Sequence, residues 1–159
     1  MADDKIQMEI AASAGRRVIG VGSVALLGLI MLYLAIVQAP GPGWQIFMVG
    51  FAALSLWMAQ RMWYATAHRL QLTPSGLRSS DGRVLAQIDD VVAVDRGVFA
   101  FKPSNGFTVK LSHKGPFAWE PGLWWRIGRR VGVGGVTHRT PARMMAELIQ
   151  ERITERSGT

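Results

Sequence analysis

The dominant feature of the hydrophobic pattern is a long apolar stretch near the N-terminus. Residues 18–60 contain no Asp, Glu, Lys, Arg or His, which is 43 consecutive positions. A bilayer core of about 30 Å requires roughly 20 residues of helix. The stretch is therefore long enough for two membrane spans, which we place at Val18–Val37 and Trp44–Trp63.

The residues between these spans favour a chain reversal. Residues 38–43 include two prolines and two glycines, which end the first helix and let the chain turn back. We therefore predict a transmembrane hairpin over residues 18–64, preceded by a tail of residues 1–17. Gly20, Gly28 and Ala35 fall on one face of the first span, where small side chains let helix backbones approach closely. We expect this seam to pack on the second span, with a partner-binding groove as the alternative.

The flanking charges predict the orientation of the hairpin. Arg16 and Arg17 precede the first span, Arg61 and Arg69 follow the second, and the turn between the spans carries no charge. Positive residues concentrate on the cytoplasmic side of membrane proteins. We therefore expect a multi-pass protein of the inner (cytoplasmic) membrane with both termini in the cytoplasm.

After the hairpin, residues 65–159 show the alternation typical of short strands, punctuated by turn residues such as Pro74-Ser75-Gly76 and Asp81-Gly82. The expected strands are 68–73, 77–80, 83–88, 91–94, 98–102 and 107–111. The side chains expected to line their buried face are Phe99, Phe101, Phe107, Val109 and Leu111. Strands at this spacing suggest a small antiparallel barrel or sandwich.

The pattern changes to helical spacing at the C-terminal end. Thr140 is a suitable N-cap, and Pro141 suits the first helical position. We predict an amphipathic helix over residues 141–156. Its expected apolar stripe contains Met145, Leu148, Ile149 and Ile153.

Three short motifs in residues 68–94 carry a resemblance to a known family. They are Leu72-Thr-Pro-Ser-Gly-Leu-Arg78, Asp81-Gly-Arg83 and Ile88-Asp-Asp-Val-Val-Ala-Val94. Together with the hairpin, this block resembles bacterial membrane proteins that carry a PH-like (pleckstrin-homology-like) domain behind a two-helix hairpin. The resemblance implies an α+β membrane protein with a PH-like β-barrel or sandwich, closed by the C-terminal helix. Membrane-complex assembly is among the roles suggested for such proteins.

The charge of the chain points to an anionic partner. The net charge is +7, and the chain from Arg61 onward holds 15 Lys and Arg against 8 acidic residues. The cytoplasmic leaflet is negatively charged and attracts such segments. Aromatic and basic residues also interleave in single-strand nucleic-acid platforms, but tethering to a membrane favours lipid or protein as the partner.

One segment combines the residue types that bind lipid headgroups. Tryptophan prefers the headgroup level, and arginine pairs with phosphate. The candidate lipid- or partner-binding residues are Lys114, Trp119, Trp124, Trp125, Arg126, Arg129 and Arg130. The alternative is that one or two of these tryptophans fill the core of the domain, and the sequence leaves both interpretations open.

The sequence offers little for catalysis. There are no cysteines, which excludes disulfides, zinc fingers and thiol chemistry, and His68, His113 and His138 are far apart in the sequence. The glycines at 132–135 follow Arg129 and Arg130 and suit either a phosphate-binding loop or a tight strand turn. We expect no enzyme activity and no cofactor or metal.

These observations predict a scaffold, assembly or accessory protein of the inner membrane. Its basic domain would dock on a membrane protein complex or on anionic lipid headgroups. The alternative is a lipid-binding module that acts without a protein complex. Nucleic-acid binding and small-molecule transport are disfavoured, and homo-oligomer formation stays open.

Overall fold

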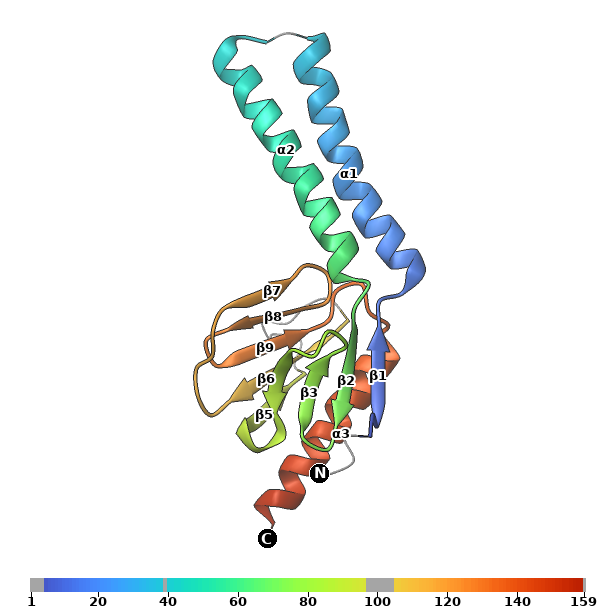
Figure 1. Ribbon diagram of the computed structural model, residues 1–159, viewed down its shortest axis with the longest axis vertical. Helices are drawn as coiled ribbons and strands as arrows, with labels where there is room; N and C mark the ends of the chain where they lie inside the picture. Colours follow the sequence, from blue (N-terminus) through green and yellow to red (C-terminus); the bar gives the residue numbers. More distant parts are fainter. Residues whose placement is uncertain (1–4, 39, 97–104, 159) are drawn as a thin grey trace.

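The computed structural model describes residues 5–38, 40–96 and 105–158 of the chain. It is a mixed α+β structure in which a helical hairpin projects from one end of a β domain (Figure 1). The hairpin consists of α1 (Ala14–Val37) and α2 (Pro42–Ala65). Both helices have 24 residues, about 36 Å of helix, and are long and apolar enough to cross a membrane by length and composition. Each extends beyond the predicted span, because helical hydrogen bonding continues past the apolar stretch.

The N-terminal segment contains a strand that the sequence analysis did not predict. β1 (Met8–Ala11) precedes the hairpin and pairs antiparallel with β2 (Arg69–Thr73), which directly follows it. Ile10 faces the core and is 1% exposed. The description of residues 1–17 as a tail is therefore wrong for this part. Four residues are too few to show strand alternation, and the strand is defined only by its distant partner.

The outer side of the β1–β2 pair is held by an ion pair. Arg69 donates to Glu9 across 2.7 Å, and Gln71 donates to the second oxygen of the same carboxylate across 3.2 Å. These hydrogen bonds, with that from Arg69 the largest contribution, lower the pKa of Glu9 below its usual range. Cross-strand pairs of this kind help to fix the register of neighbouring strands.

The β domain consists of two antiparallel sheets. The first has the order β1-β2-β3-β4, and the second has the order β5-β6-β9-β8-β7. The remaining strands are β3 (Gly76–Ser79), β4 (Val84–Gln87), β5 (Val91–Asp95), β6 (Phe107–Leu111), β7 (Ala118–Glu120), β8 (Trp124–Ile127) and β9 (Arg130–Val133).

Among the described residues the two sheets do not close into a barrel, so the barrel form of the expectation is wrong. A short 3₁₀ turn, η1 (Ile88–Asp90), lies between β4 and β5. It carries the chain from the first sheet to the second, and the two strands do not pair along their length. The predicted strands from 68 to 94 and at 107–111 are present, whereas the predicted strand 98–102, with Phe99 and Phe101, lies outside the described residues.

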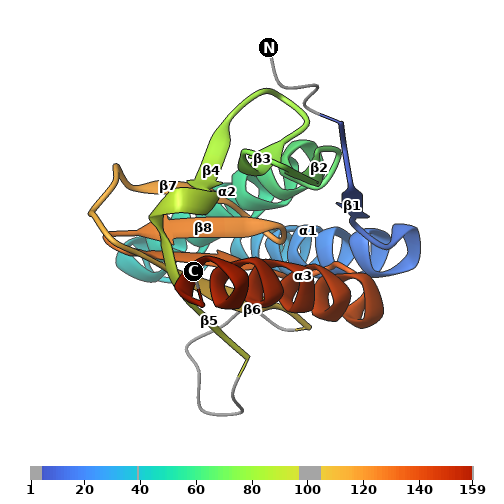
Figure 2. The ribbon, with the colours of Figure 1, turned by 90° about the horizontal axis from the view of Figure 1, so that it is seen from below.

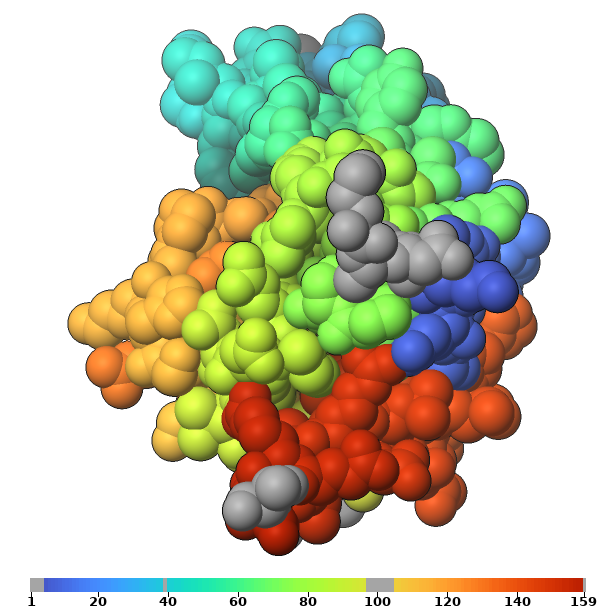
Figure 3. Space-filling model, turned by 60° about the horizontal axis from the view of Figure 1, so that its bottom comes forward, coloured from blue at the N-terminus to red at the C-terminus, as the bar shows by residue number. Residues whose placement is uncertain are grey.

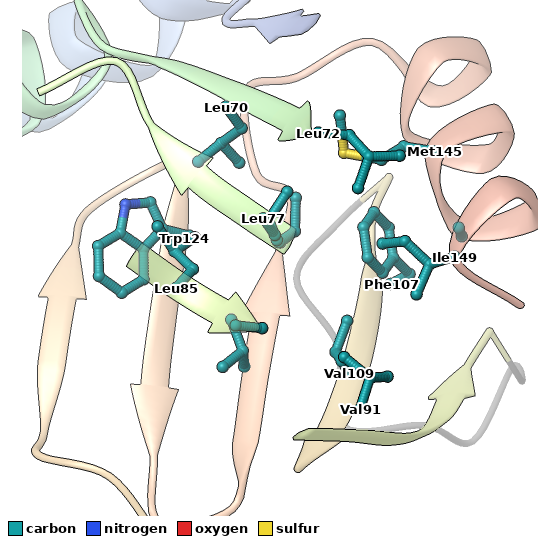
Figure 4. Close-up of a cluster of buried hydrophobic side chains, with 14 of the residues drawn as sticks. Leu70, Leu72, Leu77, Leu85, Val91, Phe107, Val109, Trp124, Met145 and Ile149 are labelled. Carbon is teal, nitrogen blue, oxygen red and sulfur yellow. The ribbon is translucent and has the colours of Figure 1, made fainter. Parts of the chain in front are cut away.

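Apolar side chains from both sheets and the C-terminal helix form one core (Figure 4). Leu70, Leu72, Leu77 and Leu85 of the first sheet face the second sheet, whose contribution includes Phe107. The predicted inward positions Val109 and Leu111 are also buried. Alternation with a period of two places all of these side chains between the sheets.

The C-terminal helix α3 (Arg139–Ser157) closes one side of the two sheets. Seen from the end opposite the hairpin, it lies between the β1 side of the first sheet and β5–β6 of the second (Figure 2). The helix begins two residues before the predicted start, because Ala142 N–H already donates to the His138 carbonyl across 3.4 Å. His138, not Thr140, is therefore the N-cap, and Pro141 lies within the first turn, where its missing N–H is tolerated.

The predicted apolar stripe of α3 is largely correct. Met145, Ile149 and Ile153 are buried in the core, while Leu148 is 37% exposed. Near the end of the helix, Arg156 donates to the carbonyls of Ile88, Asp89 and Val91. The end of α3 is thereby held against the turn that joins the two sheets.

The hairpin is joined to the β domain by several direct contacts. An isolated β-bridge links Ala12 to Thr137, Ser13 N–H donates to the Val136 carbonyl across 2.8 Å, and Arg16 donates to the Thr137 carbonyl across 3.0 Å. On the α2 side, the Met62 side chain lies next to Gly122, which is between β7 and β8. A Cβ atom added to this glycine would lie 3.0 Å from the Met62 methyl group. Both ends of the hairpin therefore contact the domain.

We expect Ile10→Ala to destabilise the domain by about 2–5 kcal/mol, because it removes a buried side chain from β1. Ile6→Ala is the matched control, because Ile6 is 46% exposed and lies just outside the strand. The measurement is urea-dependent proteolysis of the full chain in mild detergent. Equal urea midpoints for the two variants would contradict the assignment of β1 to the core.

Candidate functional site

The segment rich in tryptophan and arginine forms one edge of the second sheet. It contains β7 and β8 and continues into β9, and it projects at the left of the space-filling view in orange (Figure 3). β7 is the edge strand and lies beneath α2 (Figure 1). Because strand residues alternate between faces, the candidate residues do not all point the same way.

Trp124 and Arg126 belong to the inner side of the sheet. Trp124 is 4% exposed and lies in the core among the leucines of the first sheet (Figure 4). The Arg126 guanidinium group lies against Gly115 and donates to the Leu85 carbonyl of β4 across 3.4 Å. Trp124 is therefore not available on the surface for a lipid or partner, whereas Arg126 is partly buried and already has this backbone partner. For Trp124 the core interpretation is therefore correct.

Trp119, Trp125 and Arg130 lie on the opposite side of the sheet. Trp119 pairs with Trp125 across β7 and β8, and Trp125 in turn pairs with Gly132. A Cβ on Gly132 would clash with the Trp125 indole, so the ring occupies the space that this glycine leaves open. Trp125 is half-buried by this contact, whereas Trp119 is 40% exposed.

Ile127 and Lys110 extend this surface. Ile127 pairs with Arg130, which also pairs with Lys110 on β6, and all three side chains are exposed. We call this surface the outer face, and it consists of Lys110, Trp119, Trp125, Ile127 and Arg130. Sequence reasoning missed Lys110 and Ile127, although their alternation with buried neighbours was a usable signal.

The two remaining candidates lie in connecting segments. Lys114 is exposed in the loop between β6 and β7, and Arg129 is exposed in the turn between β8 and β9. The loop that holds Lys114 lies next to the turn that holds Arg129, because Leu111 N–H donates to the Arg129 carbonyl and Gly115 N–H donates to the Gly128 carbonyl. They therefore border the outer face at the end of the strands.

An ion pair joins β7 of the second sheet to the residue that precedes β4 of the first sheet. Arg83, just before β4, lies 2.8 Å from the carboxylate of Glu120, whose side chain is 7% exposed at the end of β7. Arg83 also pairs with Asp81 across 2.8 Å. A buried carboxylate requires such a partner, because an unpaired charge is costly away from water.

This cluster shifts two pKa values. Burial opposes the charged form of Asp81, but hydrogen bonds from the Arg83 backbone and from Ser79, with the Arg83 charge, outweigh it and lower the pKa of Asp81. Burial likewise opposes the charge on Arg83, but Glu120 and Asp81 outweigh it and raise the pKa of Arg83. Both residues are thus held in their charged forms.

The seam residues of α1 face α2. A Cβ on Gly28 would lie 3.0–3.2 Å from Leu56, Ser55 and the Ala52 carbonyl, and one on Gly20 would lie 2.9 Å from the Met62 methyl group. Ala35 is completely buried, and its carbonyl accepts a hydrogen bond from Gln45 across 3.2 Å. The seam is therefore occupied within the chain and leaves no groove at these positions.

The side chains that could bind a metal ion, and the glycine segment at 132–135, can also be placed in the structure. They contain no group of three or more His, Cys, Asp or Glu side chains that could hold a metal ion. Gly132 lies within β9 under Trp125, and the N–H groups of Gly134 and Val136 donate to the carbonyls of Leu123 and Gly122. The glycine segment is thus a strand and its turn, with these amides already paired.

Comparison with protein-family models, with curated proteins and with solved structures finds no match for this chain.

Substitution of the tryptophans separates core from surface. We expect Trp124→Ala to destabilise the protein by about 3–5 kcal/mol, because it empties a core position. Trp119→Ala should change stability by less than about 0.5 kcal/mol, as is usual for surface substitutions. Urea-dependent proteolysis of the full chain in mild detergent measures both. A large loss of stability in Trp119→Ala would show that this side chain is structural.

Proposed function

We propose that this chain is a non-enzymatic scaffold, assembly or accessory protein of the inner membrane. In this proposal α1 and α2 span the bilayer, and the β domain lies at the cytoplasmic surface. The outer face then docks on a membrane protein complex. The fold is proposed to be PH-like, on the basis of two antiparallel sheets closed by a C-terminal helix and of the motifs in residues 72–94.

The observation that carries this proposal is the double connection between hairpin and domain. β1 and β2 are neighbouring strands, and the Ala12–Thr137 bridge ties the residues before α1 to the segment between β9 and α3. If the hairpin served only to keep the domain near the membrane, one flexible linker between them would be enough. A domain held at a fixed angle presents one surface in one orientation, which suits docking on a neighbouring membrane protein and raises the local concentration of a weak binding surface.

The composition and exposure of the hairpin support a position in the bilayer. Large apolar side chains such as Ile36, Ile46 and Leu54 are exposed along both helices, and apolar surface of this extent normally contacts lipid or protein. At the base of the hairpin, the Arg17 guanidinium group lies 4.0 Å from the Trp63 ring centre. Arginine and tryptophan are typical of the interface between membrane and water.

The outer face also supports the alternative, in which the domain binds anionic lipid without a protein complex. Its two tryptophans and two basic side chains are the residue types that favour headgroups and phosphate. The two proposals differ in what substitution of the outer-face residues should release from the chain, a protein partner or a bound lipid. Purification of the chain from its native membrane distinguishes them.

The proposed topology can be tested by cysteine labelling, because the natural chain contains no cysteine. Gly41→Cys places a thiol in the turn, where a Cβ meets nothing within 4 Å, and Lys5→Cys and Ser157→Cys mark the two termini. We expect a membrane-impermeant maleimide to label only Gly41→Cys in spheroplasts, and all three after lysis. Labelling of a terminal cysteine in intact spheroplasts would refute the cytoplasmic orientation.

Docking is tested by purifying the tagged full chain from its native membrane in mild detergent, with stoichiometry measured by mass spectrometry. We expect one stoichiometric membrane protein partner, which Trp119→Ala/Arg130→Gln releases. Val84→Ala, an exposed apolar position on the other sheet, should retain it. Recovery of the chain with anionic lipid alone would favour the lipid-binding alternative, and recovery with neither would contradict both.

A further inference from the structure

A second basic site lies apart from the outer face, at the beginning of α3. A cleft of about 510 Å³ opens between the first turns of α3 and the start of β6. Arg139 and Arg143 line it from the helix, Asn105 lines it from the approach to β6, and Arg96 lines it from the end of β5. None of these residues belongs to the tryptophan- and arginine-rich segment.

The cleft carries a net positive charge. Among the described residues, three arginines line it against one acidic residue, Glu147, so these side chains together carry a formal charge of +2. Arg96 and Arg143 both pair with the same oxygen of Glu147, at 3.2 Å and 3.0 Å. One carboxylate oxygen therefore serves two guanidinium groups. The Arg143 side chain is 75% exposed and therefore accessible to a ligand.

The position of Arg139 at the beginning of α3 is electrostatically unfavourable. The N-terminus of a helix carries partial positive charge, so acidic residues and side-chain caps are favoured there. α3 has neither, because its first turn contains no acidic residue and the N-cap His138 makes no side-chain capping hydrogen bond. Arg139 instead occupies the first turn, where its Nε donates to Asn105 across 3.3 Å.

The cleft also lies close to the base of the hairpin. The segment immediately before α3 contacts the start of α1 through the hydrogen bonds of Val136 and Thr137. From there α3 runs away from the hairpin towards the C-terminus at the other end of the domain (Figure 1). A hairpin that spans the bilayer places the beginning of α3 at the headgroup level and its end in water.

We propose that this cleft binds the phosphate group of an anionic phospholipid, with Arg139 and Arg143 as the principal ligands and Arg96 completing the site. The site rests on the membrane position proposed above, but it is independent of the outer face. Arginine suits it because its planar fork binds phosphate oxygens in pairs. Bound lipid would then fix the height of the domain at the membrane surface.

The test titrates the full chain in neutral detergent with dihexanoyl phosphatidylglycerol, followed by calorimetry. Dihexanoyl phosphatidylcholine and inorganic phosphate serve as comparison probes. We expect phosphatidylglycerol to bind at least about tenfold more tightly than either comparison probe, a difference of about 1.4 kcal/mol. Arg139→Gln/Arg143→Gln should weaken its binding at least about tenfold. Lys5→Gln, which removes an exposed positive charge elsewhere, should leave the affinity unchanged.

Two further variants keep the test informative if the double variant fails to fold. Glu147→Gln removes the competing carboxylate and should tighten binding several-fold. Arg139→Lys/Arg143→Lys keeps the charge but loses the planar fork, and should bind more weakly than the natural chain. Unchanged affinity in Glu147→Gln and in the lysine variant, or in a folded glutamine double variant, would overturn the proposal.

The comparison probes separate the other outcomes. Inorganic phosphate binding as tightly as phosphatidylglycerol would make a soluble anion the ligand and refute the lipid assignment. Because the titration is done in detergent, it reports on the cleft whether or not a protein partner is recovered or the cysteine labels give the expected topology. A negative lipid titration would therefore refute the phosphate site alone, whereas negative purification and labelling results would refute the proposed function.

Discussion

The pairing of β1 with β2 is the constraint on which the arrangement of the molecule depends. Unpaired backbone groups along the edge of β2 would have to find other partners, and β1 provides them while burying Ile10. Because one strand comes directly before the hairpin and the other directly after it, the hairpin is an insertion between two neighbouring strands. Its two ends must therefore leave the domain side by side.

This constraint reaches the second sheet through the segment that follows β9. The bridge from Ala12 to Thr137 fixes the start of α3 beside the start of α1. The arginine-lined cleft is thereby held near the hairpin, while Arg156 holds the far end of the helix against the turn between the sheets. The outer face and the cleft thus occupy fixed positions relative to the hairpin, which is the property that a docking module requires.

The partners of the basic residues divide them into two groups with different roles. Arg83 pairs with a buried carboxylate and Arg126 reaches a backbone carbonyl between the sheets, so both stabilise the domain. Arg130 and Arg143 are exposed and present their charge to solvent. Arg126 and Arg130 lie on opposite faces because Arg130 pairs with Ile127 across the β8–β9 turn, and the side chain of Ile127 points away from that of its neighbour Arg126. The net charge alone therefore overstates the surface available to an anionic partner.

The sequence by itself determined the features that depend on local pattern. Apolar runs and turn residues fixed the two helices, five of the strands and the C-terminal helix, because each follows from periodicity and backbone preference over a few adjacent residues. The tertiary structure alone decided the features that depend on distant partners. It made Met8–Ala11 a strand and placed Trp124 in the core and Trp119 on the surface. It also gathered Arg96, Arg139 and Arg143 around one cleft, because contacts between residues far apart in the chain are not encoded in any local pattern.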